Sequence, residues 1–219
     1  MRKDFSHIVL DLKDKFKTEV IEYFNETYKQ GATPNPCAIC NYHVKWGELY
    51  NYALKELDCD YFATGHYAKI VHEDGHSKIF KCFDQNKDQS YFLAQVSKEA
   101  LDKCLFPLGN IDKQEVRKIA NELKLSIADK KDSTGICFIG ERNFREFLKN
   151  YIPMKEGNIV DIDTNEVIGK HNGVYYYTIG QRKGLGVSFG RPAYVVSIKG
   201  NDVILGFEDE LFKKEVIVN

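Results

Sequence analysis

Several features that would assign this sequence to a special class of protein are missing from it. No stretch of its 219 residues approaches the roughly 20 consecutive apolar residues that a membrane-spanning helix needs. The opening residues, Met1 to His7, lack the apolar core of a signal peptide. Neither sign of charge dominates, because the net charge is −1. We therefore expect a cytoplasmic protein in which contact with nucleic acid would come from local basic clusters.

The sequence also has too few cysteines for a disulfide-stapled fold. Six cysteines in a chain of this length, without a secretion signal, are expected to be mostly reduced. Cys59, Cys82 and Cys104 stand beside apolar residues, which predicts that they are small core residues. The other three stand in segments that contain proline or glycine, where a thiol can meet a ligand.

What the sequence does contain is a change of pattern along its length. Apolar residues at helical spacing predict helices over residues 14–29, 44–57 and 112–124, and short apolar runs predict strands at residues 8–10 and 61–64. Residues 67–71 and 78–83 fit the two strands of a hairpin. The last third is rich in Val, Ile and Tyr with glycine turns, which predicts antiparallel β structure. We expect an α/β first part and a mainly β last part.

A rigid loop precedes the first pair of cysteines. Pro34 and Pro36 cannot both sit inside a helix or a central strand, so residues 33–36 predict an ordered loop that leads into a helix. The dipole of that helix would favour the thiolate of a cysteine near its start. The spacing of Cys37 and Cys40 fits a reactive thiol, a redox pair, half of a zinc site or a structural loop. A zinc site would need two more ligands, and the sequence has no second Cys-x-x-Cys pair.

Two further segments carry candidate chemistry, and each has a structural alternative. Cys137 lies between Gly135 and Gly140, where the backbone can approach a ligand closely, but a small core cysteine would fit as well. Gly65 and His66 end a predicted strand, at the edge of a sheet where α/β proteins bind ligands. A structural histidine would give the same pattern.

Two polar segments are candidates for contact with nucleic acid. Lys87, Asp88 and Gln89 could touch phosphates or base edges, or Asp88 could instead cap a helix. Residues 177–186 place an Arg-Lys pair among three glycines, a pattern that fits either phosphate contact or a solvated hairpin tip.

Taken together and in this order, the motifs resemble the tRNA-specific 2-thiouridylase family (MnmA/TrmU). The resemblance rests on six blocks that span nearly the whole chain: residues 33–41, 63–68, 87–93, 106–109, 131–142 and 177–186. It implies a partial Rossmann-like α/β domain over residues 1–140, of the PP-loop ATP pyrophosphatase (adenine nucleotide α-hydrolase-like) type. A small mixed, mainly β, tRNA-contacting domain would follow over residues 141–219.

The resemblance also implies a reaction. Members of the family use ATP, with Mg²⁺ expected, to adenylate O2 of the wobble uridine in tRNA and then deliver sulfur to C2. By position, Cys137 would carry the persulfide, and Cys40 would release the sulfur by closing a transient Cys40–Cys137 disulfide. The sulfur donor would be a cysteine desulfurase or a sulfur-relay protein. No metal bound within the fold is expected.

The remaining site residues fall into three groups under this resemblance. Gly65 would lie against the nucleotide. Contacts with tRNA would come from His66, Lys87, Asp88 and Gln89. The flipped-out target base would be surrounded by Asn35, Pro36 and Cys37.

The sequence departs from the family pattern at three points. Cys37 stands where the family usually has Asp, so an acid–base role there is in doubt, and this thiol could compete with Cys40. The Ser-Gly-Gly-x-Asp-Ser phosphate loop of the family does not occur. The family's C-terminal β-barrel is expected to be missing or barely begun at Asn219.

These departures lead to expectations about the isolated chain. A separate polypeptide could supply the phosphate loop, and without it we expect little binding of ATP. A sheet without its first strands would expose edges and apolar surface, which predicts marginal solubility or self-association. Two alternatives to the enzyme stay open: a non-catalytic tRNA-binding fragment of the family, and a Cys-x-x-Cys thiol redox protein.

Overall fold

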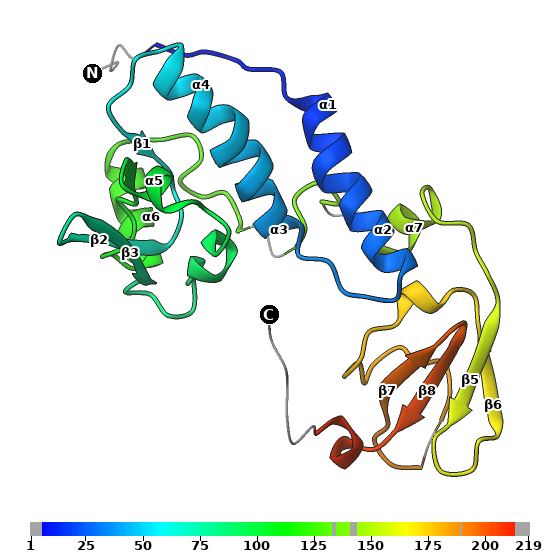
Figure 1. Cartoon of the computed structure of the whole chain (residues 1–219). Helices are drawn as coiled ribbons and strands as arrows, with labels where there is room; N and C mark the ends of the chain where they lie inside the picture. Colours follow the sequence, from blue (N-terminus) through cyan, green and yellow to red (C-terminus); the bar gives the residue numbers. More distant parts are fainter. Residues whose placement is uncertain (1–5, 133–134, 141–143, 189, 213–219) are drawn as a thin grey trace. The chain divides into compact units, whose positions relative to one another are not determined.

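The computed structural model describes residues 6–132, 135–140, 144–188 and 190–212 (Figure 1). The chain forms two compact units. The first unit comprises Met1–Glu22 and Asn35–Cys137, and the second comprises Tyr23–Pro34 and Phe138–Asn219. In the described ranges, no helix combines the length and the apolar character that crossing a membrane requires.

The first unit contains most of the helices. In chain order its elements are α1 (Lys13–Phe16), η1 (Lys17–Glu22), α3 (Pro36–Ile39), η2 (Cys40–Leu49), α4 (Tyr50–Lys55), β1 (Phe62–Ala63), β2 (Ala68–Glu73), β3 (His76–Lys81), η3 (Ser90–Leu93), α5 (Lys98–Leu101), β4 (Cys104–Leu105) and α6 (Lys113–Glu122). The helices predicted over residues 14–29, 44–57 and 112–124 are all present, although their bounds differ.

The helix that carries the first cysteines begins earlier than the apolar spacing predicts. Helical structure runs from Pro36 through α3, η2 and α4 to Lys55, the long blue-to-cyan rod of Figure 1. The Ala38 N–H donates to the Asn35 side-chain oxygen at 3.2 Å, so Asn35 caps the helix. Pro36 suits the first turn because its missing N–H would have no partner there. The proline loop thus ends in a helix start, as predicted, and puts Cys37 and Cys40 in the first turn.

The core of the first unit joins this helix to a parallel pair of short strands. β1 pairs with β4, and the buried cluster consists of Trp46, Ala68, Leu93, Val96, Ala100, Leu101, Cys104 and Phe106. The Trp46 indole N–H donates to the Cys104 sulfur at 2.9 Å, which ties the helix to β4. Cys82 and Cys104 are buried as predicted, whereas Cys59 is only half-buried.

One predicted strand of the first unit is wrong. Residues 8–10 are neither helix nor strand, and Val9 is 80% exposed. A strand needs a hydrogen-bonded neighbour, and within the described residues β1 pairs only with β4. The apolar run therefore has no sheet to join.

The hairpin and the last helix of the first unit follow the sequence closely. β2 and β3 pair antiparallel from Ala68 opposite Lys81 to Glu73 opposite His76. The turn uses Asp74 and Gly75, both at positive φ. α6 begins at an Asp112 cap, whose carboxylate accepts the Glu115 N–H at 2.8 Å.

The second unit is mainly β, as predicted. Its elements are α2 (Tyr23–Lys29), α7 (Phe144–Lys149), β5 (Gly157–Asp161), β6 (Val167–His171), η4 (Val174–Tyr176), β7 (Tyr194–Lys199), β8 (Asp202–Gly206) and η5 (Glu208–Leu211). The sheet has the order β6-β5-β8-β7. Two of its pairings are antiparallel, but β5 and β8 run parallel, so the prediction of a purely antiparallel sheet is wrong. The chain between β5 and β8 is long enough for the crossover that a parallel pairing requires.

Candidate functional site

Cys37 and Cys40 lie three residues apart at the start of the helical stretch that begins with α3. Such a spacing puts two side chains on one face of a helix. Cys37 is exposed and Cys40 is half-buried. Burial raises the pKa of the Cys40 thiol, and the nearby Lys45 ammonium opposes that shift. Burial also raises the pKa of Cys37, so the expectation that the helix start lowers these values is wrong in direction. Loss of water around the sulfur disfavours the charged thiolate, which raises both pKa values.

The fold brings Cys137 to this pair of thiols. Cys137 is exposed, and all six cysteines are free. The charge of its thiolate is close enough to raise the pKa of both Cys37 and Cys40. The interpretation of Cys137 as a small core residue is therefore wrong, since the side chain is exposed and near two other sulfurs. Ser133, Thr134 and Arg142 of the same sequence block lie outside the described residues.

His66 sits in a buried network at the carboxyl end of β1. Its ring is 7% exposed and packs against Trp46 and Phe106. Lys45 donates to His66 Nε2 at 3.3 Å, so the ring proton lies on Nδ1, which contacts the Thr64 hydroxyl at 2.8 Å. Burial, and then the charge of Lys45, lower the pKa of His66 to about 4. The imidazole is therefore neutral at physiological pH.

A pocket of about 300 Å³ opens beside this network. It is lined by Lys45, Thr64, Gly65, His66 and Gln89. An added Cβ at Gly65 would meet its nearest atom at 3.8 Å, an ordinary contact, so the backbone there is open to close approach. Such a pocket stands at the carboxyl end of a parallel strand, where α/β proteins bind ligands. The lining offers one ammonium, which already contacts His66, so it does not fit a triphosphate without further cationic or amide donors.

The Lys87–Gln89 segment uses its side chains within the protein. The Asp88 carboxylate accepts the Cys82 N–H at 2.9 Å and the Ser90 hydroxyl at 2.7 Å. Gln89 and Tyr67 exchange two hydrogen bonds, because the Gln89 N–H donates to the Tyr67 carbonyl and the Tyr67 N–H donates to the Gln89 side chain. Asp88 does not cap a helix, since η3 has Gln89 at its N-cap position. The segment is fixed from several sides.

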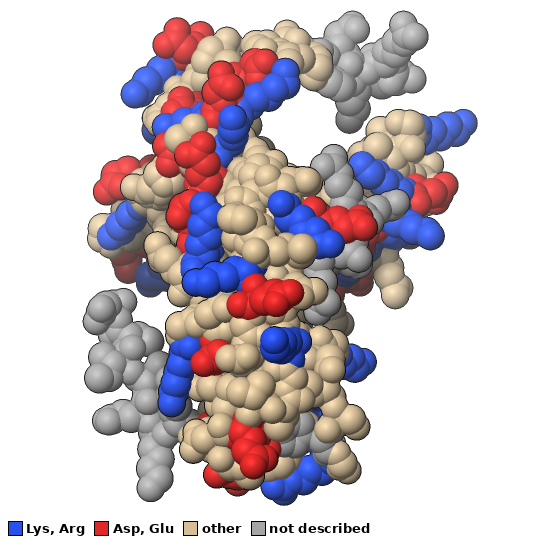
Figure 2. Space-filling model, turned by 90° about the vertical axis from the view of Figure 1, so that its right-hand side faces the viewer, with Lys and Arg blue, Asp and Glu red and all other residues tan. Residues whose placement is uncertain are grey.

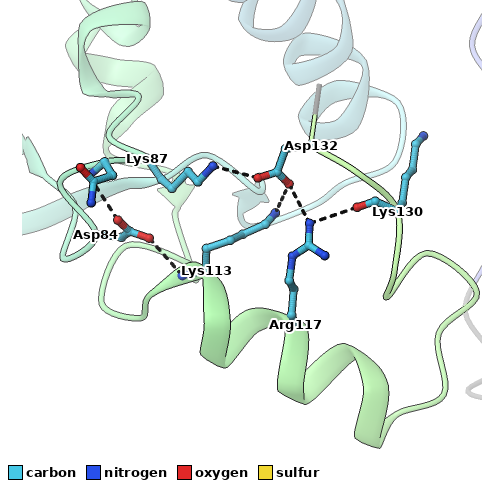
Figure 3. Close-up of polar contacts among 7 residues, drawn as sticks. Asp84, Lys87, Lys113, Arg117, Lys130 and Asp132 are labelled. Atoms are coloured by element: carbon cyan, nitrogen blue, oxygen red, sulfur yellow. Dashed lines mark hydrogen bonds and ion pairs between the residues drawn. The ribbon is translucent and has the colours of Figure 1, made fainter. Parts of the chain in front are cut away.

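Lys87 belongs to an ion cluster that the sequence reasoning missed. Its ammonium donates to one carboxylate oxygen of Asp132 at 2.8 Å (Figure 3). The other oxygen of Asp132 meets Lys113 at 3.1 Å and Arg117 at 3.4 Å. Hydrogen bonds from Lys87, then from Lys113, hold the pKa of Asp132 well below its usual range. The position of Asp132 inside the 131–142 block was the available signal, but its partners are distant in the sequence.

Charges of the two signs are mixed over the surface that Figure 2 presents, with Lys and Arg beside Asp and Glu. This mixture agrees with the net charge of −1. Among the described residues, no group of three or more His, Cys, Asp or Glu side chains could hold a metal ion. The Cys37–Cys40 pair therefore has no described partners for a zinc site.

The two units match domains of known proteins. The family model described as the tRNA methyl transferase HUP domain matches residues 3–141, and that of the tRNA methyl transferase PRC-barrel domain matches residues 145–206. The fold is thus a Rossmann-like HUP domain of the PP-loop type, which suggests binding of ATP, followed by a small, mainly β domain.

Curated relatives define the family further. The chain is 51% identical over 187 residues to a tRNA-specific 2-thiouridylase MnmA of Mycoplasmopsis synoviae, a match that covers 85% of this chain and 49% of the relative. It is 53% identical over 190 residues to one of Geobacillus kaustophilus, covering 85% and 51% respectively. A Staphylococcus epidermidis relative is 48% identical over 204 residues, covering 92% and 54%. The chain belongs to the tRNA-specific 2-thiouridylase (MnmA) family, and it spans about half the length of these relatives.

Proposed function

We propose that this chain acts in the ATP-dependent transfer of sulfur to C2 of the wobble uridine of tRNA. The relatives carry the name tRNA-specific 2-thiouridylase. The observation that best supports the proposal is that Cys137 and Cys40, two free thiols from distant parts of the sequence, lie near enough for the charge of one to raise the pKa of the other. Binding of RNA alone would not require this pair.

The two thiols divide the sulfur chemistry between them. ATP, with Mg²⁺, supplies the adenylate that makes O2 of the uridine a good leaving group. The terminal sulfur of a Cys137 persulfide attacks C2, and AMP leaves. The Cys40 thiolate then attacks Sγ of Cys137, which breaks the persulfide S–S bond, leaves sulfur on the uridine and forms the Cys40–Cys137 disulfide. A dithiol reductant restores both thiols.

The other site residues surround this reaction in our proposal. Gly65 lies against the nucleotide, where the pocket of Lys45, Thr64 and Gln89 supports the assignment. Contacts with tRNA come from His66, Lys87, Asp88 and Gln89, while Asn35, Pro36 and Cys37 surround the target base. Because the Lys87 ammonium pairs with Asp132, a phosphate would have to exchange with that carboxylate.

We also propose the partners of the chain. The persulfide comes from a cysteine desulfurase or a sulfur-relay protein. A further proposed partner is a separate polypeptide that brings a phosphate loop, because the pocket at Gly65 offers a single ammonium. The compartment is the cytoplasm, where the thiols stay reduced between turnovers. Residues 1–140 are the adenylation part, and residues 141–219 are the tRNA-contacting part.

A sulfur-transfer assay tests the proposal. Unmodified tRNA with a wobble uridine is incubated with the chain, ATP, Mg²⁺ and a persulfide donor, and thiolated tRNA is read from its retarded migration in a mercury-containing gel. Wild type, Cys40→Ser, Cys137→Ser and Cys37→Ser are compared. We expect thiolation by wild type and none by the Cys40 and Cys137 variants. Unchanged thiolation by either variant would refute the proposed roles.

A second candidate function is the binding of tRNA without catalysis. The pocket at Gly65 favours it, because its one ammonium already contacts His66. The same gel separates the two: all four proteins would then bind tRNA by filter retention, and none would thiolate it.

A further inference from the structure

One short segment, Lys87–Phe92, contacts a residue near each of the two thiols of the proposed reaction. Asn41, next to Cys40 in the helix, is 1% exposed and donates its side-chain N–H to the Phe92 carbonyl at 2.8 Å. Asp132, five residues before Cys137, pairs with Lys87 at 2.8 Å. One end of the segment therefore touches the Cys40 helix, and the other end touches the chain that leads to Cys137.

The segment between these ends is rigid enough to transmit position. Gln89 is joined to Tyr67 by bonds of 2.8 and 3.0 Å. Asp88 holds the Cys82 backbone N–H and the Ser90 hydroxyl. Leu93, at the end of η3, is fully buried in the core. Movement of Lys87 relative to Phe92 would break several of these contacts together.

Asp132 is anchored to α6 as well as to Lys87. Lys113 and Arg117 are four residues apart on α6, so they project from one face of the helix and reach the same carboxylate oxygen. Arg117 also donates to the Lys130 carbonyl at 3.2 Å (Figure 3). The chain around residues 130–132 is thus held by two cations of α6 and by Lys87, which lies between β3 and η3.

This anchor limits where Cys137 can lie. Five residues of fully extended chain span at most about 18 Å. With Asp132 fixed by its ion pairs, the Cys137 backbone lies within that distance of the Asp132 backbone, and both residues belong to the unit that holds Cys40. Unit 1 ends at Cys137 and the second unit resumes at Phe138, so the anchor acts just before the chain changes unit.

We propose that Asp132 is a positioning residue that holds the Cys137 segment in reach of Cys40 by pairing with Lys87, Lys113 and Arg117. The inference rests on the proposed function for its purpose, because only sulfur transfer requires the two thiols to meet. It does not rest on that function for its geometry.

An isolated ion pair at a surface contributes little, and the side chains here are 28–39% exposed. The cluster differs because one carboxylate receives three cationic donors, and removal of that carboxylate leaves three cations facing one another. The effect of this cluster on the position of Cys137 should therefore depend on salt, which screens partly exposed charges.

The test measures closure of the Cys40–Cys137 disulfide and needs neither ATP nor tRNA. The full reduced chain, carrying Cys37→Ser so that Cys37 cannot compete, is treated with oxidised glutathione. Samples are quenched with acid and alkylated, and the linked peptide is quantified by mass spectrometry. Asp132→Asn is compared with Asp132→Glu and with Asp129→Asn, which makes the same charge change three positions earlier at an exposed site.

We expect Asp132→Asn to slow closure by about tenfold, since small displacements of reacting groups cost one to two orders of magnitude in rate. Asp132→Glu should recover most of the rate of disulfide closure. Asp129→Asn should close the disulfide as fast as the reference chain, which carries Cys37→Ser alone. At about 1 M salt, where the Debye length falls to about 3 Å, disulfide closure in the chain with Cys37→Ser alone should slow toward the rate of Asp132→Asn. Asp132→Asn itself should respond little to salt.

Fluorescence of Trp46, which is buried, reports whether each variant is folded. If Asp132→Asn fails to fold, Lys113→Gln removes one arm of the cluster and should slow closure severalfold. Closure at the background rate in every folded variant of the cluster would overturn the inference. Thiolation of tRNA that survives Cys137→Ser would instead overturn the proposed function, while the closure rates would still decide the role of Asp132.

Discussion

Cys40 and Cys137 are held in place by different means. Cys40 lies in a helix whose start is fixed by the Asn35 cap and by Pro36, and its neighbour Asn41 is buried. Cys137 is exposed, and its segment is held through the partly exposed ion cluster of Asp132. Local helix geometry thus places one sulfur, and long-range charge places the other. In the proposed reaction, the looser attachment suits Cys137, whose thiol takes up a sulfur atom from the donor and then meets Cys40.

The largest effect on both thiols should come from the core beneath the segment that links them. Leu93 is fully buried in η3, so Leu93→Ala should cost about 2–5 kcal/mol of the free energy of unfolding through lost burial and a residual cavity. Urea unfolding monitored by Trp46 fluorescence measures this loss in the free energy of unfolding. The matched control is Leu123→Ala, where the side chain is 56% exposed and we expect almost no change. Equal losses in the two variants would contradict the described core.

Acid should weaken the Cys40 side of the site before it weakens the ion cluster. The pKa of His66 is about 4 in the folded chain, below its ordinary value of 6.5, so the unfolded chain takes up this proton first as the pH falls. The stability present above pH 6.5 is therefore lost progressively toward pH 4, by about 3 kcal/mol from this group. His66→Gln should flatten the decline of unfolding free energy over this range. A decline as steep as that of wild type would show that His66 is not the group responsible.

The helix cap affects only the Cys40 side. Asn35→Ala removes the acceptor of the Ala38 N–H and should cost about 1 kcal/mol. Hydrogen exchange at residues 38–41 should accelerate, while exchange near Asp132 stays as it was. Asn86→Ala, at an exposed position, is the control. Faster exchange both at residues 38–41 and near Asp132 would mean that the helix cap also holds the segment that leads to Cys137.

The smallest effect should come from Lys45, whose charge lowers the pKa of three groups, Cys37 among them. Its charge lowers the pKa of both Cys40 and His66. Lys45→Met should therefore raise both values: Cys40 alkylation by iodoacetamide would need a higher pH, and the His66 titration seen by NMR would move upward. Glu48→Gln, an exposed change nearby in the helix, should shift neither. Opposite shifts at the two groups would contradict the described position of Lys45.

The sequence predicted the local parts of this structure better than the distant contacts. Helices over residues 14–29 and 112–124 and the hairpin were predictable because apolar spacing, Asp112 and the Asp74-Gly75 turn act over a few residues. The strand at residues 8–10 and the orientation of β5 against β8 were not, because both depend on partners elsewhere in the chain.

The candidate site shows the same division. Its cysteines and the Lys87–Gln89 segment could be named from motifs, and the family resemblance was confirmed. The raised pKa of Cys40 and the Asp132 cluster could not be predicted, since burial and pairing between residues 87, 113, 117 and 132 arise only in the folded chain.

In the proposed reaction, Cys137 carries the sulfur atom to the uridine and Cys40 releases it. The most direct measurement is a single turnover on unmodified tRNA with the persulfide-loaded chain and no reductant, quenched in acid and analysed by mass spectrometry for linked peptides. The proposed reaction predicts one Cys40–Cys137 disulfide for each thiolated uridine. Thiolated tRNA without that disulfide would contradict it.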